Sequence, residues 1–263
     1  MTYELSVITV CRDVGISIEP TITSVLAQQN VHIQYIIIDG NSKDDTMEVI
    51  ARHRHKINMV VSEPDLGIYD AMNKGLAYAK GDFVFFLNAK DRFFAADVAA
   101  RAVQAARDGK ADILFGDVAV TNTSGGVERH DSYRDWDLAN FFEGTVCHQG
   151  VFAARTAFEV CGRFNLQYKL AADFDWLLIA MRQQRLRTRY LSFPICYYDG
   201  TGLSSDCSPA TISKLKAELH DILEHRFTRF ERLFYKAARR CRLRQNALTW
   251  AAVLTLMQWR LRQ

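Results

Sequence analysis

Short apolar segments alternate with helix-like segments through the first half of the chain. Two apolar runs, at residues 5–10 and 35–39, begin about 30 residues apart. The segment between them, residues 18–29, carries Ile22 and Val25 at the spacing of one helix face. A strand, a helix and a second strand over this length predict a βαβ unit, in which the two strands lie parallel in one sheet.

The same alternation continues to about residue 120. The elements expected after the first unit are a helix at 44–52, a strand at 57–61, a helix at 69–79, a strand at 83–87, a helix at 95–107 and a strand or hairpin arm at 112–120. Repeated alternation of this kind predicts a doubly wound, Rossmann-like α/β domain with a mostly parallel sheet.

The second half has a less regular pattern. Residues 121–147 contain a turn signal at Gly125 and Gly126 among scattered aromatic side chains. The elements expected beyond it are a helix at 173–184, a strand at 187–193 that stops before Pro194, and one long helix at 209–240. The apolar residues of that last helix keep the three-and-four spacing of a single buried face.

Charge is distributed unevenly along the chain, although the net charge is only +3. Residues 225–263 contain ten Lys or Arg and one acid, which gives +9, and the other 224 residues contain 23 basic and 29 acidic residues, which gives −6. Within this tail, an apolar run at 247–257 is too short to cross a bilayer. Because Trp250, Trp259 and arginines accompany that run, we expect residues 241–263 to bind an anionic membrane surface.

The basic tail has two alternative partners to a membrane surface. The tail could instead pack as a helix on the acidic body of the protein or on a partner chain. Nucleic acid is not expected as a partner, because the body is acidic and no nucleic-acid-binding module is visible.

The six cysteines are widely spaced with no C-x-x-C pair, which argues against a zinc framework. No secretory signal is visible at the N-terminus, so we expect reduced thiols in a cytoplasmic protein.

Polar residues follow four successive strands of the predicted sheet, at residues 9–13, 39–42, 62–65 and 88–91. Since ligands of an open parallel sheet bind at the carboxyl ends of its strands, these positions predict a crevice for a polar ligand. The sequence has no G-x-G-x-x-G after the first strand, no G-x-x-x-x-G-K-[ST], no H-E-x-x-H and no G-x-S-x-G. These absences argue against a nicotinamide dehydrogenase, a P-loop phosphotransferase, a zinc protease and a hydrolase.

Several segments resemble the inverting family-2 glycosyltransferases with the GT-A fold. The segments are SVITV at 6–10, YIIIDGNSKD at 35–44, SEPDLGIYDAMNKG at 62–75, GDFVFFLN at 81–88, FEVCGRFN at 158–165 and ADFDWL at 172–177. They occur in the family's order over roughly residues 4–205, and they are most similar to bacterial colanic-acid and other exopolysaccharide transferases.

The resemblance implies an inverting transfer of a sugar from a UDP- or GDP-sugar to a hydroxyl group. Such a displacement needs a general base for the hydroxyl proton and positive charge for the departing diphosphate. By resemblance, Asp173 is the base, with a helix N-cap as its structural alternative. Residues of the nucleotide-sugar site would be Thr9, Cys11, Asp13, Asp39, Asn73, Asn88, Lys90 and Asp91.

The chain departs from the family at its metal motif. Where the family commonly has D-x-D-D, this chain has Asn88, Ala89, Lys90 and Asp91. Asn88 and Asp91 still offer oxygen ligands to Mg²⁺ or Mn²⁺, but the Lys90 ammonium would repel a cation. Three interpretations are open: Lys90 points away while the other two bind a metal, Lys90 itself supplies the positive charge, or the site is inert.

Three further residues are assigned to the acceptor side by the same resemblance. His148 and Gln149 match a histidine-glutamine pair of the resembling subgroup, with a packed structural histidine as the alternative. Asp175 is expected to be either a structural residue or a group near the acceptor. Met72 stands where many relatives carry Arg, which removes one possible nucleotide contact.

These expectations combine into one interpretation. Residues 1–208 would form the transferase domain, with a nucleotide-binding half at about 1–120 and an acceptor half at about 121–208, and residues 209–263 a basic helical extension. The enzyme would act on a saccharide, often lipid-linked, at the cytoplasmic face of the membrane. The alternative is a non-catalytic relative that scaffolds a polysaccharide-assembly complex.

Overall fold

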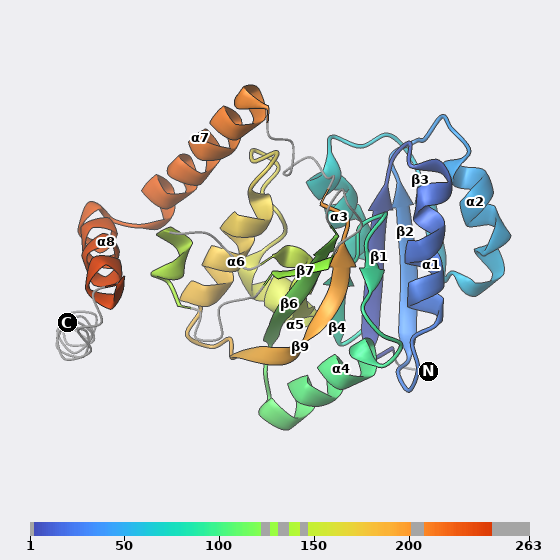
Figure 1. The fold of residues 1–263 in the computed structure, drawn as a ribbon, viewed down its shortest axis with the longest axis horizontal. Coiled ribbons are helices and arrows are strands. Elements are labelled where there is room, and N and C mark those ends of the chain that lie inside the picture. The colour runs from blue at the N-terminus through green and yellow to red at the C-terminus, as the bar shows by residue number, and fades with distance from the viewer. Residues whose placement is uncertain (1–2, 122–126, 131–136, 143–146, 201–207, 244–263) are drawn as a thin grey trace.

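The computed structural model describes residues 3–121, 127–130, 137–142, 147–200 and 208–243. These residues form one nine-stranded sheet with the order β3-β2-β1-β4-β8-β6-β9-β5, and β7 pairs with the outer part of β6 (Figure 1). The strands are β1 (Leu5–Cys11), β2 (Ile33–Asp39), β3 (Met59–Ser62), β4 (Phe83–Phe86), β5 (Arg92–Phe93), β6 (Ile113–Thr121), β7 (Val127–His130), β8 (Val151–Ala154) and β9 (Thr188–Tyr198).

The two halves of the sheet differ in strand direction. In the first half β1 pairs in parallel with β2 and β4, and β2 pairs in parallel with β3, which confirms the predicted βαβ units. The second half is mixed, because β8 runs antiparallel to both β4 and β6 while β9 runs parallel to β6. The antiparallel strand β8 therefore joins the parallel half of the sheet, β1 to β4, to the mixed half.

Helices cover both faces of the sheet (Figure 1). They are α1 (Glu19–Leu26), α2 (Thr46–Arg52), α3 (Ile68–Tyr78), α4 (Val98–Gly109), α5 (Arg155–Cys161), α6 (Ala172–Arg182), α7 (Pro209–Arg226) and α8 (Arg229–Leu243), with short 3₁₀ turns η1 (Gly15–Ile18), η2 (Arg54–Lys56), η3 (Asn140–Phe142) and η4 (His148–Gly150). Alternate strand residues face opposite sides: Val7 packs in one core with α1, α2 and α4, and Ile8 packs in the other with α3, α5 and α6. The doubly wound α/β prediction is confirmed.

Strand β9 corrects one sequence prediction. We expected this strand to stop before Pro194, but β9 continues to Tyr198. The parallel pairing of β9 with β6 shifts register at Gly116 and Asp117, opposite the segment that contains Pro194. Proline lacks an N–H group and is tolerated in a sheet where a bulge interrupts the hydrogen-bond ladder.

The predicted helix at 209–240 is also wrong, because it is two helices. Phe227 between α7 and α8 has extended backbone angles (φ −124°, ψ 138°) and is buried. Thr228 donates its N–H to the Glu231 carboxylate (2.7 Å), and Glu231 donates its own N–H to the Thr228 hydroxyl (3.2 Å). This reciprocal T-x-x-E capping box starts α8 as a new helix.

Some predictions fall outside the described residues. The Gly125-Gly126 turn and the apolar run at 247–257 belong to segments 122–126 and 244–263, so both remain predictions. Among the helices that are described, none combines the length and the apolar character required to cross a membrane.

Candidate active site

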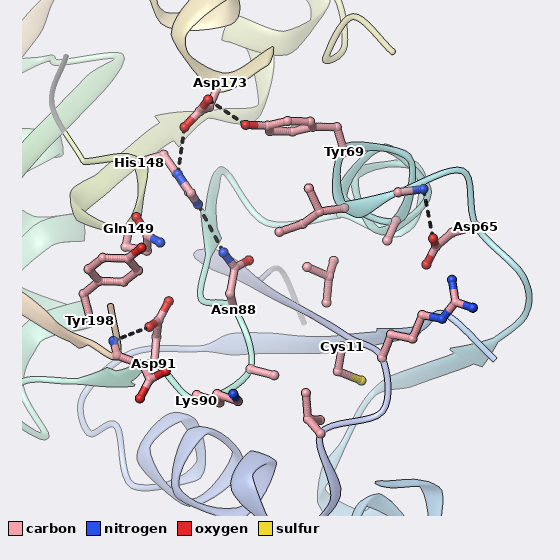
Figure 2. Close-up of a pocket in the computed structure, with 18 of the residues that line it drawn as sticks. Cys11, Asp65, Tyr69, Asn88, Lys90, Asp91, His148, Gln149, Asp173 and Tyr198 are labelled. Carbon is pink, nitrogen blue, oxygen red and sulfur yellow. Dashed lines mark hydrogen bonds and ion pairs between the residues drawn. The ribbon is translucent and has the colours of Figure 1, made fainter. Parts of the chain in front are cut away.

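A cavity of about 530 Å³ lies at the carboxyl ends of β1 and β4, beside the start of α6 (Figure 2). Its volume lies in the range of small-molecule sites in proteins. The lining residues are Val10, Cys11, Arg12, Val14, Asp65, Gly67, Ile68, Tyr69, Ala71, Asn88, Ala89, Lys90, Asp91, His148, Gln149, Lys169, Leu170, Asp173, Tyr198 and Asp199. The cavity therefore occupies the crevice that the polar strand ends predict.

Four side chains form a continuous polar chain along one wall of the cavity (Figure 2). The Asn88 amide nitrogen lies 3.2 Å from Nε2 of His148, and Nδ1 of His148 lies 2.8 Å from Oδ2 of Asp173. The hydroxyl of Tyr69 donates to Oδ1 of Asp173 at 2.7 Å. The structure thus brings together residues from the end of β4, η4, the first turn of α6 and the first turn of α3.

Asp173 is held as a carboxylate by its surroundings. It is the second residue of α6, whose N-cap is Ala171, so it is not the N-cap residue. Burial alone would raise the pKa of Asp173, but hydrogen bonds from His148, Tyr69 and the Phe174 N–H outweigh it, so the pKa lies below the usual value. A general base must be unprotonated to accept a proton, and this carboxylate meets that requirement at neutral pH.

Asn88 and Asp91 carry side-chain oxygens that could accept a further ligand. Oδ1 of Asn88 is buried and has no hydrogen-bond partner. Asp91 is 2% exposed, accepts a hydrogen bond from the Asp199 N–H at 3.0 Å and also interacts with the Gln149 side chain. Burial raises the pKa of Asp91 to about 7. A cation would give the amide oxygen a partner and would stabilise the Asp91 charge, so these two residues suit Mg²⁺ or Mn²⁺ by donor type.

The described part of the chain does not assemble three or more His, Cys, Asp or Glu side chains into a metal site. Mg²⁺ in phosphate-transfer sites is commonly held by one or two carboxylates together with substrate phosphates and water. Asn88 and Asp91 could supply only the protein part of such a set. The residues therefore fit a metal that binds together with a diphosphate.

Lys90, between Asn88 and Asp91 in the sequence, also lines the cavity, and Figure 2 shows it near Asp91. Its backbone has φ of 78°, in the left-handed region that favours glycine. A side chain in this region costs about 1–3 kcal/mol, and such strain tends to be kept at ligand sites. All three interpretations of Lys90 stay open: it points away while Asn88 and Asp91 bind a metal, it supplies the positive charge itself, or the site is inert.

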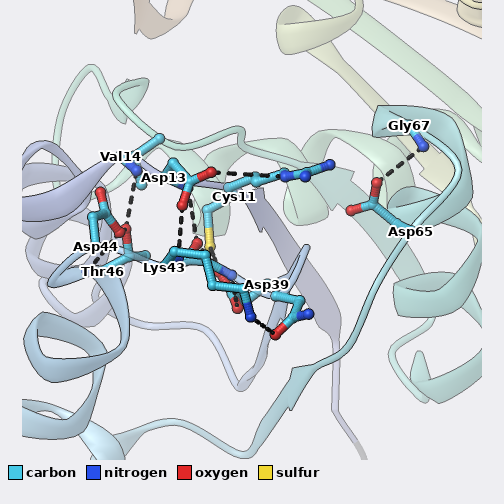
Figure 3. A network of polar contacts seen from close by, with 12 residues as sticks. Cys11, Asp13, Val14, Asp39, Lys43, Asp44, Thr46, Asp65 and Gly67 are labelled. Atoms are coloured by element: carbon cyan, nitrogen blue, oxygen red, sulfur yellow. Dashed lines mark hydrogen bonds and ion pairs between the residues drawn. The ribbon is translucent and has the colours of Figure 1, made fainter.

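The predicted nucleotide residues at the ends of β1 and β2 form a separate network (Figure 3). Asp39 is fully buried and accepts hydrogen bonds from the Ser42 N–H and hydroxyl, the Ser62 hydroxyl and the Cys11 thiol. Burial raises the pKa of Cys11, so the thiol is neutral and not a nucleophile. Of these residues only Cys11 lines the cavity.

Thr9 and Asp13 also lie outside the cavity lining. Thr9 is fully buried, and its hydroxyl lies 3.2 Å from the hydroxyl of Tyr35. Asp13 accepts the Lys43 N–H at 2.7 Å and thereby ties the loop after β1 to the loop after β2. The structure therefore does not bring either residue to the surface of the cavity.

Asn73 and Asp175 belong to other contacts. Asn73 exchanges two hydrogen bonds with the backbone of Phe164, which fixes α3 to the segment after α5. Asp175 is 1% exposed and forms a bidentate ion pair with Arg226 (2.7 and 2.9 Å), which joins α6 to α7. Of the two alternatives for Asp175, the structure favours a structural residue.

Gln149 lines the cavity, is 4% exposed and accepts a hydrogen bond from the Cys147 thiol at 2.7 Å, so its predicted place on the acceptor side stays a prediction. Sequence reasoning missed Tyr69, Lys169, Tyr198 and Asp199 as lining residues. Tyr69 lies inside the segment 62–75 that carries the family resemblance, so its position in that motif was the available signal. No local signal marks Asp199, because its contact with Asp91 spans 108 residues.

Comparison with known proteins assigns the class. The model of the family described as Glycosyl transferase family 2 matches residues 6–202. The chain therefore belongs to glycosyl transferase family 2, and it is a glycosyltransferase.

Particular relatives agree with this assignment. A PGL/p-HBAD biosynthesis glycosyltransferase of Mycobacterium bovis is 29% identical over 205 residues, which cover 75% of this chain and 77% of that protein. A crystal structure of S. aureus TarS 1–349 with UDP-GlcNAc matches with a TM-score of 0.69 at 18% identity and covers 84% of this chain and 67% of that chain. This chain spans only 44% of the longer TarS structure.

The mannosyltransferase PcManGT from Pyrobaculum calidifontis, in complex with GDP-Man and Mn²⁺, matches with a TM-score of 0.60 at 15% identity. That match covers 98% of this chain and 80% of PcManGT. At these identities the structural matches establish the fold alone. The chain has the GT-A fold of its family, as the sequence resemblance predicted.

Proposed function

We propose that the protein transfers a sugar, with inversion, from a nucleoside-diphosphate sugar to a hydroxyl group of a saccharide acceptor in cell-surface glycan synthesis. The observation that carries this proposal is the ionised Asp173 carboxylate in the wall of a cavity at the carboxyl ends of β1 and β4. The relative that acts in PGL/p-HBAD biosynthesis and the TarS complex with UDP-GlcNAc support the substrate class.

The proposed reaction is one displacement. The acceptor oxygen attacks the anomeric carbon while the bond from that carbon to the diphosphate oxygen breaks. Asp173 takes the hydroxyl proton, and the nucleoside diphosphate leaves with the bonding electrons. Because attack comes from the face opposite the leaving group, the configuration at the anomeric carbon inverts.

The donor would lie across the cavity floor. Cys11, Arg12 and Asp65 line the β1 end, where we place the nucleoside, and Asn88 and Lys90 line the β4 end, where we place the diphosphate. A screen of UDP-, GDP- and dTDP-sugars by thermal stabilisation, with and without Mn²⁺, tests this placement. We expect one nucleotide class to raise the melting temperature, and no stabilisation by any of them would contradict the proposal.

Two sources of positive charge remain for the departing diphosphate. Asn88 and Asp91 would hold Mg²⁺ or Mn²⁺, which would supply Lewis-acid stabilisation of the diphosphate when bound. Lys90 would instead supply an ammonium group directly. Transfer measured after EDTA treatment distinguishes the two: abolished transfer supports the metal, and undiminished transfer leaves Lys90 as the charge that acts.

We also propose that the acceptor is lipid-linked and that the basic extension holds the enzyme at the cytoplasmic face of the membrane. Within α8, Phe230 and Leu233 are 58% and 62% exposed, and Arg229 and Lys236 are exposed beside them. An exposed face of this composition suits an interface with anionic lipid. It extends the membrane prediction for residues 241–263 into a helix that the structure describes.

Deletion of residues 241–263 tests the membrane proposal. We expect the shortened protein to move from the membrane fraction to the soluble fraction. A second variant, with Phe230 and Leu233 both changed to Ser, should bind anionic vesicles more weakly. If both variants sediment with membranes as the full chain does, the membrane proposal is wrong.

A further inference from the structure

His148 lies between the two ends of the proposed reaction. One ring nitrogen faces the Asn88 amide at 3.2 Å, and the other faces the Asp173 carboxylate at 2.8 Å (Figure 2). Its side chain is 19% exposed and lines the cavity, with apolar residues of β4, β8 and α5 behind it. Among the described residues, His148 is the one whose side chain contacts both Asn88, at the end of β4, and Asp173, the proposed base.

The two contacts assign the ring tautomer. The Asn88 amide nitrogen can only donate, so Nε2 of His148 must accept and carries no proton. Nδ1 therefore carries the proton and donates it to Oδ2 of Asp173. Both ring nitrogens then have a hydrogen-bond partner, and the orientation of the ring is fixed.

Each of the two His148 contacts fixes the orientation of one neighbouring side chain. The bond to Asp173 keeps one carboxylate oxygen occupied by His148 while Tyr69 occupies the other, so the carboxylate is held in one rotamer at the start of α6. The bond from Asn88 holds the amide nitrogen toward His148, which leaves Oδ1 of Asn88, a buried atom without a partner, for the donor side. One imidazole thus sets the orientation of both groups.

We propose that His148 is a positioning residue that couples the donor site to the base by fixing the positions of the Asn88 and Asp173 side chains relative to each other. The inference rests on the proposed function, because it takes Asp173 as the base. It goes further by assigning to His148 a two-sided role, through its contacts with Asn88 and Asp173.

Two substitutions separate the two sides. In His148→Asn the amide nitrogen occupies about the place of Nδ1, so the bond to Asp173 is kept and the reach to Asn88 is lost. In His148→Gln the amide oxygen reaches about the place of Nε2, so the bond from Asn88 is kept and the donor to Asp173 is lost. A single hydrogen bond corresponds to about a tenfold effect.

We therefore expect His148→Asn to weaken binding of the donor nucleotide about tenfold and to change kcat little, and His148→Gln to do the reverse. UDP and GDP, titrated by calorimetry in the full chain, give the binding constants without any turnover. Steady-state transfer gives kcat. Equal losses in both variants and in both quantities, or a lower melting temperature as the only change, would overturn the proposal.

Two controls keep the result interpretable. His225, an exposed histidine of α7, receives the same two substitutions, and neither should change binding or kcat. The ¹⁵N chemical shifts of the His148 ring should show a protonated Nδ1 and an unprotonated Nε2, and the opposite tautomer would overturn the proposal. If wild-type protein transfers no sugar from any donor, the proposed function fails, while the nucleotide titrations and the ring shifts still decide the role of His148.

Discussion

The carboxyl edge of the sheet has two polar ends that differ in how their polar groups are satisfied, and of the Asp39 network at the first end only Cys11 lines the cavity. At the ends of β1 and β2, Asp39 has every acceptor position engaged by neighbouring hydroxyl, N–H and thiol groups (Figure 3). At the end of β4, a buried Asn88 oxygen has no partner and Asp91 has a raised pKa (Figure 2). Both ends are rich in carboxylates, so residue type alone does not distinguish them.

The difference teaches where chemistry can occur. A saturated network keeps a backbone shape and offers little to a ligand, because each hydrogen bond to a ligand would replace an existing one. A group without a partner is costly in the free protein and gains most when a ligand arrives. We therefore expect substitutions at the saturated end to reduce stability and substitutions at the open end to reduce activity.

The largest expected effect is on Asp173. Asp173→Asn removes the proposed base and keeps the size of the side chain, so we expect kcat to fall by about 10²–10⁴. Binding of the donor nucleotide should stay within a few-fold of wild type, since the nucleoside subsite is unchanged. Steady-state transfer and calorimetry measure the two effects, and turnover equal to that of wild type would refute the assignment.

Asp175 provides the matched control two residues along α6. Asp175→Asn breaks the ion pair with Arg226, which stays partly exposed, so we expect a loss of about 3 kcal/mol in the free energy of unfolding. The kcat of the molecules that remain folded should not change. Urea unfolding measures the stability, and a fall in kcat without loss of stability would return Asp175 to the acceptor side.

Asp39 tests the saturated end directly. In Asp39→Asn one oxygen becomes an NH₂ group that faces other donors, so we expect a loss of about 1–3 kcal/mol in the free energy of unfolding. Nucleotide affinity should fall only at temperatures near the lowered melting point. If affinity fell at 10 °C in a fully folded variant, Asp39 would contact the nucleotide, and the contrast between the two ends would be weaker than we infer.

The smallest effect concerns Tyr69 and pH. Tyr69→Phe removes a hydrogen bond that helps to lower the pKa of Asp173, so that pKa should rise and the base should begin to be protonated at a higher pH. Transfer should be nearly normal at pH 8 and should decline as pH falls, by at most about tenfold relative to wild type at pH 5. Matching pH profiles of kcat/KM for both proteins would contradict this.

The accuracy of the sequence predictions followed the range of the interactions involved. The strands and helices of the first half were predicted because period-2 and period-3.6 patterns are local properties of the chain. The break at Phe227 was missed even though Thr228 and Glu231 form a local capping signal, because the apolar spacing continued across it. Strand β9 was cut short at Pro194 because the bulge that accommodates proline belongs to its pairing with β6.

The candidate site shows the same difference between what local sequence patterns predict and what long-range contacts decide. The resemblance gave Asp173 as the base and His148, Gln149, Asn88, Lys90 and Asp91 as neighbours, and all six line the cavity. It also gave Thr9, Asp13 and Asp39, which the structure places outside the lining. Which strand-end residues face the cavity depends on side-chain direction and on loop contacts, such as the bond between Asp13 and Lys43, and neither can be seen in strand spacing.

The sequence by itself determined the α/β class, the family and the set of polar residues at the strand ends, since these depend on local periodicity and on ordered motifs. The tertiary structure decided which of those residues act together. Tyr69 and Asp173 are 104 residues apart in the chain, and Asn88 and His148 are 60 apart, yet each pair is within hydrogen-bond distance. Such contacts arise when β8 and α6 pack against the parallel half of the sheet, and packing over that distance leaves no mark in a local pattern.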